Sequence, residues 1–228
     1  MKKVIIISGP TASGKTKVSL ELISKGMQKN IPFAIVNFDS LLFYNELNIG
    51  TAKPTAEELA KFPHYMVNIA SITNPLNASD YYKKAIPVIQ KLHDDNIIPI
   101  LVGGSGFYLR SLIKGMYECP TISEELKEKN ERIFQKEGIA PFLEILKKND
   151  PYSYDRLHPN DSYRIIRATE FFQTTGKPIS SEKSRLDSQN PYDFSNSGTQ
   201  EWKIFHSYMD VPKDQHQIII EKLFFFIG

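Results

Sequence analysis

Short apolar runs alternate with amphipathic segments through the first half of the chain. Each run is bounded by turn or loop residues, which is the pattern of a buried strand, and the segments between them repeat apolar residues at helical spacing. The pattern predicts strands at Val4–Ser8, Phe33–Asn37, Met66–Ile69 and Ile97–Val102, and helices at Lys15–Met27, Ala56–Phe62, Ser79–His93 and Phe107–Ile113. We place Ser79 as an N-cap. Strands that alternate with helices predict a parallel sheet covered by helices.

The pattern changes after Cys119. Three helices are predicted, at Ser123–Glu137, Pro141–Asn149 and Asp161–Thr175, with no strand among them. Asp161 is suited to cap the third helix and Gly176 to end it. A polar segment, Ser180–Thr199, is expected to be a loop, and Trp202–Met209 a strand that returns to the sheet. We therefore predict an α/β core formed by residues 1–117 and 200–228, with an all-helical insertion domain at 118–199.

A glycine-rich segment joins the first strand to the first helix. It has the spacing G-x-x-x-x-G-K-T and consists of Gly9, Pro10, Thr11, Ala12, Ser13, Gly14, Lys15 and Thr16. In this context successive backbone N–H groups and the positive helix end face an anion, while the lysine adds a charge and Thr16 a hydroxyl for Mg²⁺. A turn that merely joins strand and helix does not need that spacing. The segment predicts polyphosphate binding and a P-loop NTPase-like parallel sheet core.

The composition indicates the class of protein and the cellular compartment in which we expect it. The 228 residues are 41% hydrophobic and 24% charged, which is ordinary for a globular protein. A single cysteine allows no internal disulfide and suits a reducing compartment. No signal peptide and no run of membrane-spanning length is visible, so we expect a cytoplasmic protein without a membrane partner. The net charge of +2 does not by itself indicate nucleic-acid binding.

Asp39 follows the second predicted strand. Because ligands of open α/β sheets gather at the carboxyl ends of the strands, we expect it near the phosphate loop. There it would hold Mg²⁺ through water or take a proton from a nucleophile, and it would also serve as a cap for a helix at Leu41–Leu47. The turn Gly103–Gly106 either brings backbone close to a ligand or is an ordinary connection. Lys53 is expected to be solvated.

Two arginines, Arg164 and Arg167, share a face of the third insertion helix. They would grip the phosphates of a nucleic acid or of a second substrate, or remain solvated and pair with Glu170. From these residues alone the chain is a P-loop enzyme, for which a kinase of a small metabolite is one interpretation, with the arginines acting from a lid.

Taken together, the motifs resemble those of the tRNA dimethylallyltransferase family, also called isopentenyl-diphosphate:tRNA transferases. The resemblance spans about residues 1–176 and keeps the family's order. The adenylate isopentenyltransferases share the core, but the helical insertion favours the tRNA enzymes. The matching segments are Gly9–Thr16, Asp39–Tyr44, Asn48–Pro54, Pro63–Ile69, Leu101–Leu109, and His158–Asp161 followed by Arg164, Arg167 and Glu170.

The resemblance implies transfer of a dimethylallyl group from dimethylallyl diphosphate to N6 of adenosine 37 in tRNA. The phosphate loop would then hold the diphosphate, with Mg²⁺ at Thr16. Asp39 would accept the proton of the exocyclic amine, and Thr11 would bind the diphosphate beside its bridging oxygen. The enzyme is expected to act as a monomer. The tRNA contacts carried over by position are Asp39, Ser40, Leu41, Leu42, Ser105, Tyr163, Arg164, Ile165, Ile166 and Arg167.

Three departures from the family's pattern are visible. Asn68 stands where the family has Asp, which is expected to cost a structural hydrogen bond, and Ser105 replaces Thr with the hydroxyl kept. The C-terminus is also shortened, because neither the Gly-Tyr-Arg motif nor the basic Lys-Arg-Gln segment of the family follows Gly176. The alternatives to the transferase are thus a small-metabolite kinase and a truncated, non-catalytic tRNA-binding member of the family.

Overall fold

The computed structural model describes residues 2–115, 121–186, 193–195, 197–198 and 200–210. The chain divides into two compact units. Residues 1–116 and 191–228 form the first, which we call the sheet unit, and residues 117–190 form the second, which we call the helical unit. In the described part of the chain, every helix is too short or too polar to cross a membrane.

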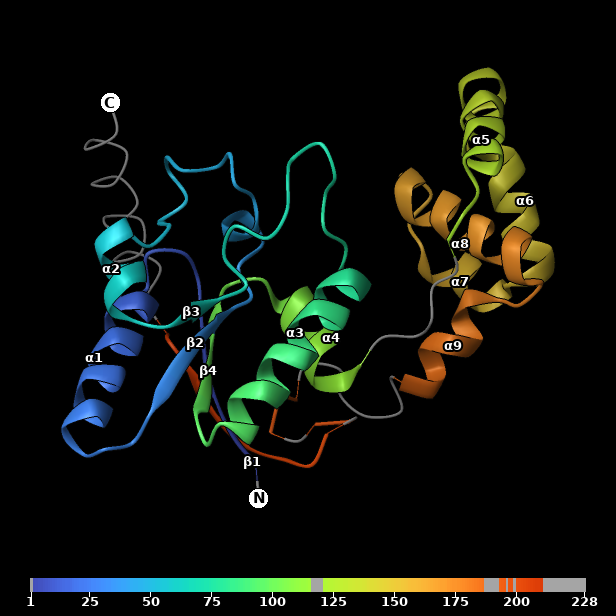
Figure 1. Cartoon of the computed structure of the whole chain (residues 1–228). Helices are drawn as coiled ribbons and strands as arrows, with labels where there is room; N and C mark the ends of the chain where they lie inside the picture. The colour runs from blue at the N-terminus through green and yellow to red at the C-terminus, as the bar shows by residue number, and fades with distance from the viewer. Residues whose placement is uncertain (1, 116–120, 187–192, 196, 199, 211–228) are drawn as a thin grey trace. The chain divides into compact units, whose positions relative to one another are not determined.

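The sheet unit is built on five parallel strands in the order β3-β2-β4-β1-β5. Figure 1 shows these strands and the helices that connect them. The strands are β1 (Lys2–Ser8), β2 (Phe33–Asn37), β3 (His64–Tyr65), β4 (Ile98–Gly103) and β5 (Trp202–Tyr208). The helices are α1 (Lys15–Gln28), the 3-10 turn η1 (Ser40–Phe43), α2 (Ala56–Lys61), α3 (Ala78–Asp94) and α4 (Gly106–Lys114).

Helices cover both faces of this sheet. On β1, Val4 and Ile6 belong to a buried cluster with Leu109 of α4, while Ile7 belongs to a second cluster with Ile23 of α1. Alternate residues of the strand therefore pack against different helices, which is why β1 is a continuous apolar run. Because all strands run the same way, their carboxyl ends meet at one edge of the sheet.

The prediction of a parallel sheet covered by helices is confirmed, and β5 returns to pair with β1 as expected. The predicted strand Met66–Ile69 is wrong, since β3 ends at Tyr65 and Met66 and Asn68 have φ values of 62° and 55°. Such positive values are incompatible with a strand. The cap of α3 is Asn77 rather than Ser79, because the Asn77 side chain accepts the N–H of Asp80.

The helical unit contains five helices in its described residues. They are α5 (Glu124–Glu137), α6 (Ala140–Asn149), α7 (Pro151–Arg156), α8 (Ser162–Thr175) and α9 (Ile179–Leu186). Their buried core includes Phe142, Leu146, Phe171 and Ile179. The predicted caps of α8 are confirmed: Asp161 accepts the N–H of Arg164, and Gly176 ends the helix in the left-handed conformation.

Two expectations for this region are wrong. The helix α7 was not predicted, and α9 occupies the start of the segment expected to be a loop from Ser180. Ile179 explains the second error, because its burial in the helical core anchors the start of a segment in which Ser180–Arg185 are polar. The helical unit also ends at residue 190 instead of 199. Phe194 already packs in the core of the sheet unit.

One buried carboxylate fastens α7 to α9. Asp150 is 1% exposed, and its Oδ1 accepts the N–H of Ser153 at 3.1 Å. Its Oδ2 accepts the Ser153 hydroxyl at 2.8 Å and the N–H of Ser180 at 3.1 Å. Burial raises the pKa of Asp150, but the hydrogen bonds from Ser180 and Ser153 outweigh it and hold that pKa below its ordinary value.

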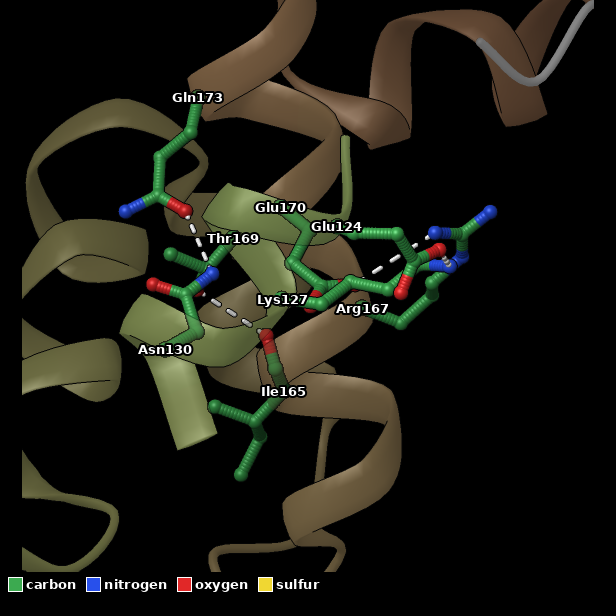
Figure 2. A network of polar contacts seen from close by, with 8 residues as sticks. All are labelled: Glu124, Lys127, Asn130, Ile165, Arg167, Thr169, Glu170 and Gln173. Carbon is green, nitrogen blue, oxygen red and sulfur yellow. Dashed lines mark hydrogen bonds and ion pairs between the residues drawn. The ribbon is translucent and has the colours of Figure 1, made fainter. Parts of the chain in front are cut away.

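A second polar contact joins α5 to α8 (Figure 2). Asn130 is 1% exposed, and its Nδ2 donates to Oε1 of Gln173 at 2.9 Å. One turn earlier on α8, the buried hydroxyl of Thr169 donates to the carbonyl oxygen of Ile165 at 3.0 Å. Of these two contacts, the hydrogen bond between Asn130 and Gln173 ties α8 to α5, and the bond of Thr169 stays within α8.

Candidate active site

The phosphate loop connects β1 to α1. A methyl group at Gly9 would lie 2.8 Å from the carbonyl oxygen of Met209, so only glycine fits where the chain after β5 approaches the loop. Gly14 has φ 86° and precedes α1 without any side-chain cap. The first-turn N–H groups of α1 therefore receive no side-chain acceptor, which leaves them suited to an anion.

Lys15 reaches back across this loop. Its Nζ donates to the carbonyl oxygens of Gly9 at 3.0 Å and of Pro10 at 2.6 Å. Partial burial lowers the pKa of Lys15, and the negative charge of Asp39 opposes that shift. The ammonium is thus held beside the loop, and Thr16 lies exposed at the second position of α1.

Asp39 faces the same space as Lys15. Its Oδ1 accepts the N–H of Leu41 at 3.3 Å, which confirms its role as a cap, although of the short turn η1 and not of a helix Leu41–Leu47. A methyl group placed at Gly104 would lie 3.1 Å from the carbonyl oxygen of Gly9, 3.6 Å from Oδ2 of Asp39 and 4.0 Å from Nζ of Lys15. We call this space, bordered by those three groups, the Gly104 gap.

The ends of β2 and β4 are joined next to the gap. The N–H of Ser40 donates to Oγ of Ser105 at 3.1 Å, and that hydroxyl donates to Oγ of Ser40 at 3.2 Å. Leu41 is exposed and Leu42 is half-buried on the turn that follows. The structure therefore brings together every predicted site residue of the sheet unit: the phosphate loop, Asp39–Leu42 and Ser105.

The remaining predicted site residues lie on α8 of the helical unit. Tyr163 is 78% exposed, and Arg164 forms an ion pair with Asp161 at 3.2 Å. Arg167 pairs with Glu170 at 3.4 Å, as one interpretation of the sequence expected. Ile165, another of the positions predicted to contact tRNA, is fully buried in the helical core, so its side chain does not reach the surface. Ile166 also packs against that core.

Sequence reasoning misjudged Lys53. Its Nζ donates to the carbonyl oxygen of Tyr44 at 2.7 Å, to Oδ1 of Asn48 at 3.0 Å and to Oδ1 of Asn68 at 2.8 Å. The lysine is thus a tie between the loop after η1 and the loop after β3. Asn68 keeps a hydrogen bond in spite of its replaced carboxylate. No local pattern announces this contact, because its partners are up to 15 residues away.

The end of β5 supports the phosphate loop, which the sequence also did not reveal. The N–H of Met209 donates to the carbonyl oxygen of Ser8 at 2.7 Å. The hydroxyl of Ser8 lies 2.7 Å from Nε2 of His206, and burial lowers the pKa of that histidine. The neutral imidazole and the strand backbone therefore hold the residue that precedes Gly9.

A metal ion in this site would need ligands beyond the protein. In the described part of the chain, no three His, Cys, Asp or Glu side chains gather as a metal cluster. Mg²⁺ commonly takes one or two protein groups, several waters and the phosphates of a substrate. An exposed Thr16 hydroxyl beside the phosphate loop, with Asp39 across the gap, fits that donor set.

The comparison with known proteins now adds to this geometry. The family model described as IPP transferase matches residues 42–211. The chain belongs to the IPP transferase family. The matched range begins after Asp39, so the assignment of the phosphate loop and of Asp39 to the site depends on their geometry and not on that match.

Individual relatives of the family agree. A tRNA dimethylallyltransferase of Vesicomyosocius okutanii is 40% identical over 179 residues, which cover 78% of this chain and 57% of that protein. One of Coxiella burnetii is 39% identical over 194 residues, covering 85% of this chain and 61% of the relative. The chain therefore spans less than two thirds of the length of these relatives.

Two solved structures share the architecture. A eukaryotic dimethylallyltransferase acting on tRNA superposes with a TM-score of 0.77 over 98% of this chain and 53% of its own, at 24% identity, which supports the fold alone. The tRNA delta(2)-isopentenylpyrophosphate transferase of Staphylococcus epidermidis gives a TM-score of 0.57 at 28% identity, over 100% of this chain and 69% of its own. The α/β fold with a P-loop is thus the fold of the family.

Proposed function

We propose that this chain transfers a dimethylallyl group from dimethylallyl diphosphate to N6 of adenosine 37 in tRNA. The observation that carries the proposal is the Gly104 gap. There a carboxylate on one strand end lies close to a phosphate loop and its lysine on another, around a position where glycine places no side chain. Family membership supplies the reaction class, and the names of the relatives supply the acceptor.

The proposed reaction is a substitution at the allylic carbon C1. The N6–C1 bond forms and the bond between C1 and the diphosphate oxygen breaks, so the electron pair leaves with the diphosphate. Asp39 takes the proton that N6 loses and later returns it to solvent. The N–H groups of the phosphate loop and Lys15 meet the negative charge that develops on the leaving oxygen.

The rest of the loop positions the leaving group. Thr11 is exposed in the loop, and we assign its hydroxyl to the diphosphate beside the bridging oxygen. When bound at Thr16, Mg²⁺ would neutralise charge on the diphosphate. A kinase would use the same loop for ATP, but none of the contacts among the described residues of the sheet unit favours a particular small-molecule acceptor.

The tRNA is proposed to meet two surfaces. Ser40, Leu41, Leu42 and Ser105 border the gap, where the adenine would enter after leaving its stack. On the helical unit, the exposed ring of Tyr163 is placed to stack with nucleotides and Arg164 to contact phosphates, together with Ile166 and Arg167 beside them. We propose that the enzyme works as a monomer in the cytoplasm.

Mass spectrometry of an anticodon stem-loop RNA tests the proposal. After incubation with the protein, dimethylallyl diphosphate and Mg²⁺, the RNA is expected to gain one dimethylallyl group at the adenosine. Asp39→Asn should slow transfer by roughly a hundredfold or more while diphosphate still binds. Transfer at the wild-type rate in that variant refutes the base assignment. RNA binding without transfer indicates a binding role, and label transferred from ATP to a metabolite indicates a kinase.

A further inference from the structure

The strongest feature outside the residues already assigned is a buried amide at the end of β2. Asn37 is the last residue of that strand and is 3% exposed. Its Oδ1 accepts the N–H of Asp39 at 2.9 Å, and its Nδ2 donates to the carbonyl oxygen of Asp39 at 3.1 Å. One side chain therefore binds both backbone polar groups of the proposed base.

The same amide reaches a second loop. Its Nδ2 also donates to the carbonyl oxygen of Met66 at 2.9 Å, 29 residues along the chain. Met66 is buried and has a positive φ of 62°, a conformation that bulky residues adopt rarely. The contact thus joins the turn that carries Asp39 to the loop after β3, in a buried position where an unfilled carbonyl would be costly.

The backbone of Asn37 is held in turn by Tyr81 of α3. Its carbonyl oxygen accepts the hydroxyl of Tyr81 at 3.0 Å. Tyr81 is fully buried in α3, and burial raises its pKa far above the ordinary value, so the hydroxyl remains a donor. The Tyr81 ring stacks on Phe43 with centroids 5.1 Å apart and meets Tyr108 edge-on at 5.3 Å. A rigid aromatic cluster therefore fixes the residue that fixes Asp39.

These hydrogen bonds limit the conformational freedom of Asp39 and so affect where its carboxylate can lie. With its N–H and carbonyl bound by Asn37, and its Oδ1 accepting the N–H of Leu41 at 3.3 Å, Asp39 has little freedom left. Its Oδ2 is the carboxylate oxygen closest to the Gly104 position, at 3.6 Å from a methyl group placed there. Asn37 thus holds the backbone from which the side chain of the proposed base extends.

We propose that Asn37 is a positioning residue that aims Oδ2 of Asp39 into the Gly104 gap, an inference that rests on the proposed function. Asn37 touches no substrate and acts only through Asp39. Its loss should lower kcat for prenyl transfer by roughly ten- to a hundredfold, since small errors in placing a reacting group have effects of that size. The KM for dimethylallyl diphosphate should change by less than about threefold, because the phosphate loop is untouched.

The experiment compares Asn37→Ala with Ser111→Ala, each in the full chain. Ser111 is fully buried in α4 and its hydroxyl donates to the carbonyl oxygen of Tyr108 at 2.7 Å, so its replacement removes a hydrogen bond of a buried side chain that does not involve Asp39. We expect a loss of kcat in Asn37→Ala alone. If Asn37→Ala does not fold, Asn37→Ser keeps the side chain polar but too short for all three contacts, and the same comparison applies.

A double-mutant cycle separates positioning from general stability. In an Asp39→Asn background, Asn37→Ala should change kcat by less than about twofold, because the group that it positions no longer acts as a base. A merely structural role would lower kcat by the same factor in both backgrounds. Equal losses in the two backgrounds, or equal losses in Asn37→Ala and Ser111→Ala, overturn the inference.

A readout that needs no turnover distinguishes this inference from the proposed function. Amide hydrogen exchange measured by NMR should show the Asp39 N–H exchanging at least about tenfold faster in Asn37→Ala than in Ser111→Ala. If the wild type fails to transfer a prenyl group but this acceleration is found, the proposed function is wrong, and the hydrogen bonds by which Asn37 holds the Asp39 backbone are supported. Unchanged exchange of the Asp39 amide refutes the inference that Asn37 holds the Asp39 backbone, whatever the transfer activity.

Discussion

Gly104→Ala is the sharpest test of the Gly104 gap. The added methyl group would lie 3.1 Å from the carbonyl oxygen of Gly9, closer than ordinary van der Waals contact, and 3.6 Å from Oδ2 of Asp39. The φ of Gly104 lies outside the left-handed region, so alanine meets no backbone penalty there. The substitution therefore fills the space between base and phosphate loop without straining its own residue.

The size of the effect follows from these contacts. A methyl group in the gap would displace the amine and the allylic carbon from their approach, or push the phosphate loop by a few tenths of an ångström. Displacements of this kind cost up to about a hundredfold in rate. We expect kcat/KM for prenyl transfer to fall roughly ten- to a hundredfold, which is about 1.4–2.7 kcal/mol in transition-state stabilisation. The melting temperature should stay within a few degrees of the wild type.

Gly106 supplies a matched control two residues away. It begins α4, has no positive φ, and a methyl group there would meet nothing within 4 Å. Gly106→Ala should keep wild-type transfer and raise stability by about 0.4–1 kcal/mol, since alanine has fewer unfolded conformations. Steady-state transfer assays on the two variants, with thermal melts, measure both quantities. Equal kcat/KM in Gly104→Ala and Gly106→Ala would show that the gap holds no reacting atoms.

Two further predictions concern polar contacts, one inside the helical unit and one inside the sheet unit. Because the folded-state pKa of Asp150 is lowered, its stabilising contribution is complete near neutral pH and is lost as the pH falls through that lowered pKa. In urea titrations, Asp150→Asn should therefore weaken the helical unit at pH 7 but lessen its further loss in acid; parallel acid profiles would contradict this. Lys53→Met should lower stability by about 1 kcal/mol and speed amide exchange in residues 44–53, whereas Lys53→Arg should change exchange less. Unchanged exchange in Lys53→Met would exclude the tie.

Parts of the sheet were predictable because its strands are buried on both faces. The run Phe33–Asn37 has four apolar residues before Asn37, is bounded by turn residues, and forms β2 with those limits. The run Met66–Ile69 also consists of apolar residues and one Asn but forms a loop, in which Met66 is 5% exposed and Asn68 has a positive φ. Apolar residues report burial, and burial alone does not distinguish a strand from a loop folded over the core.

Some features of the candidate site could likewise be predicted from the sequence, and others could not. The neighbourhood of Asp39 and the phosphate loop followed from the sequence, because both lie directly after strands whose carboxyl ends share an edge. The roles of Asn37 and Lys53 did not follow. Asn37 donates to the backbone carbonyl of Met66 and Lys53 donates to the side-chain oxygen of Asn68, and neither acceptor can be identified from the sequence near its donor. Tertiary contacts of this kind are known only once the loops are placed.

The position of the gap follows from the strand order. β4 lies between β1 and β2, so the turn that leaves β4 lies between the phosphate loop after β1 and Asp39 after β2. The chain leaves β1 through α1 and leaves β4 through α4, helices that pack on opposite faces of the sheet, and ligands of open α/β sheets bind beside strand ends connected in this way.

Adjacent glycines in that turn serve different neighbours. A methyl group at Gly103 would lie 2.7 Å from the N–H nitrogen of Asp39 and 2.7 Å from the ring of Phe38, so Gly103 is required for packing against the end of β2. Gly104 instead faces the phosphate loop and the gap. A substitution at Gly103 should therefore disturb folding, whereas one at Gly104 should disturb only the reaction. Of these two adjacent residues, Gly103 is therefore required by the fold and Gly104 by the proposed reaction.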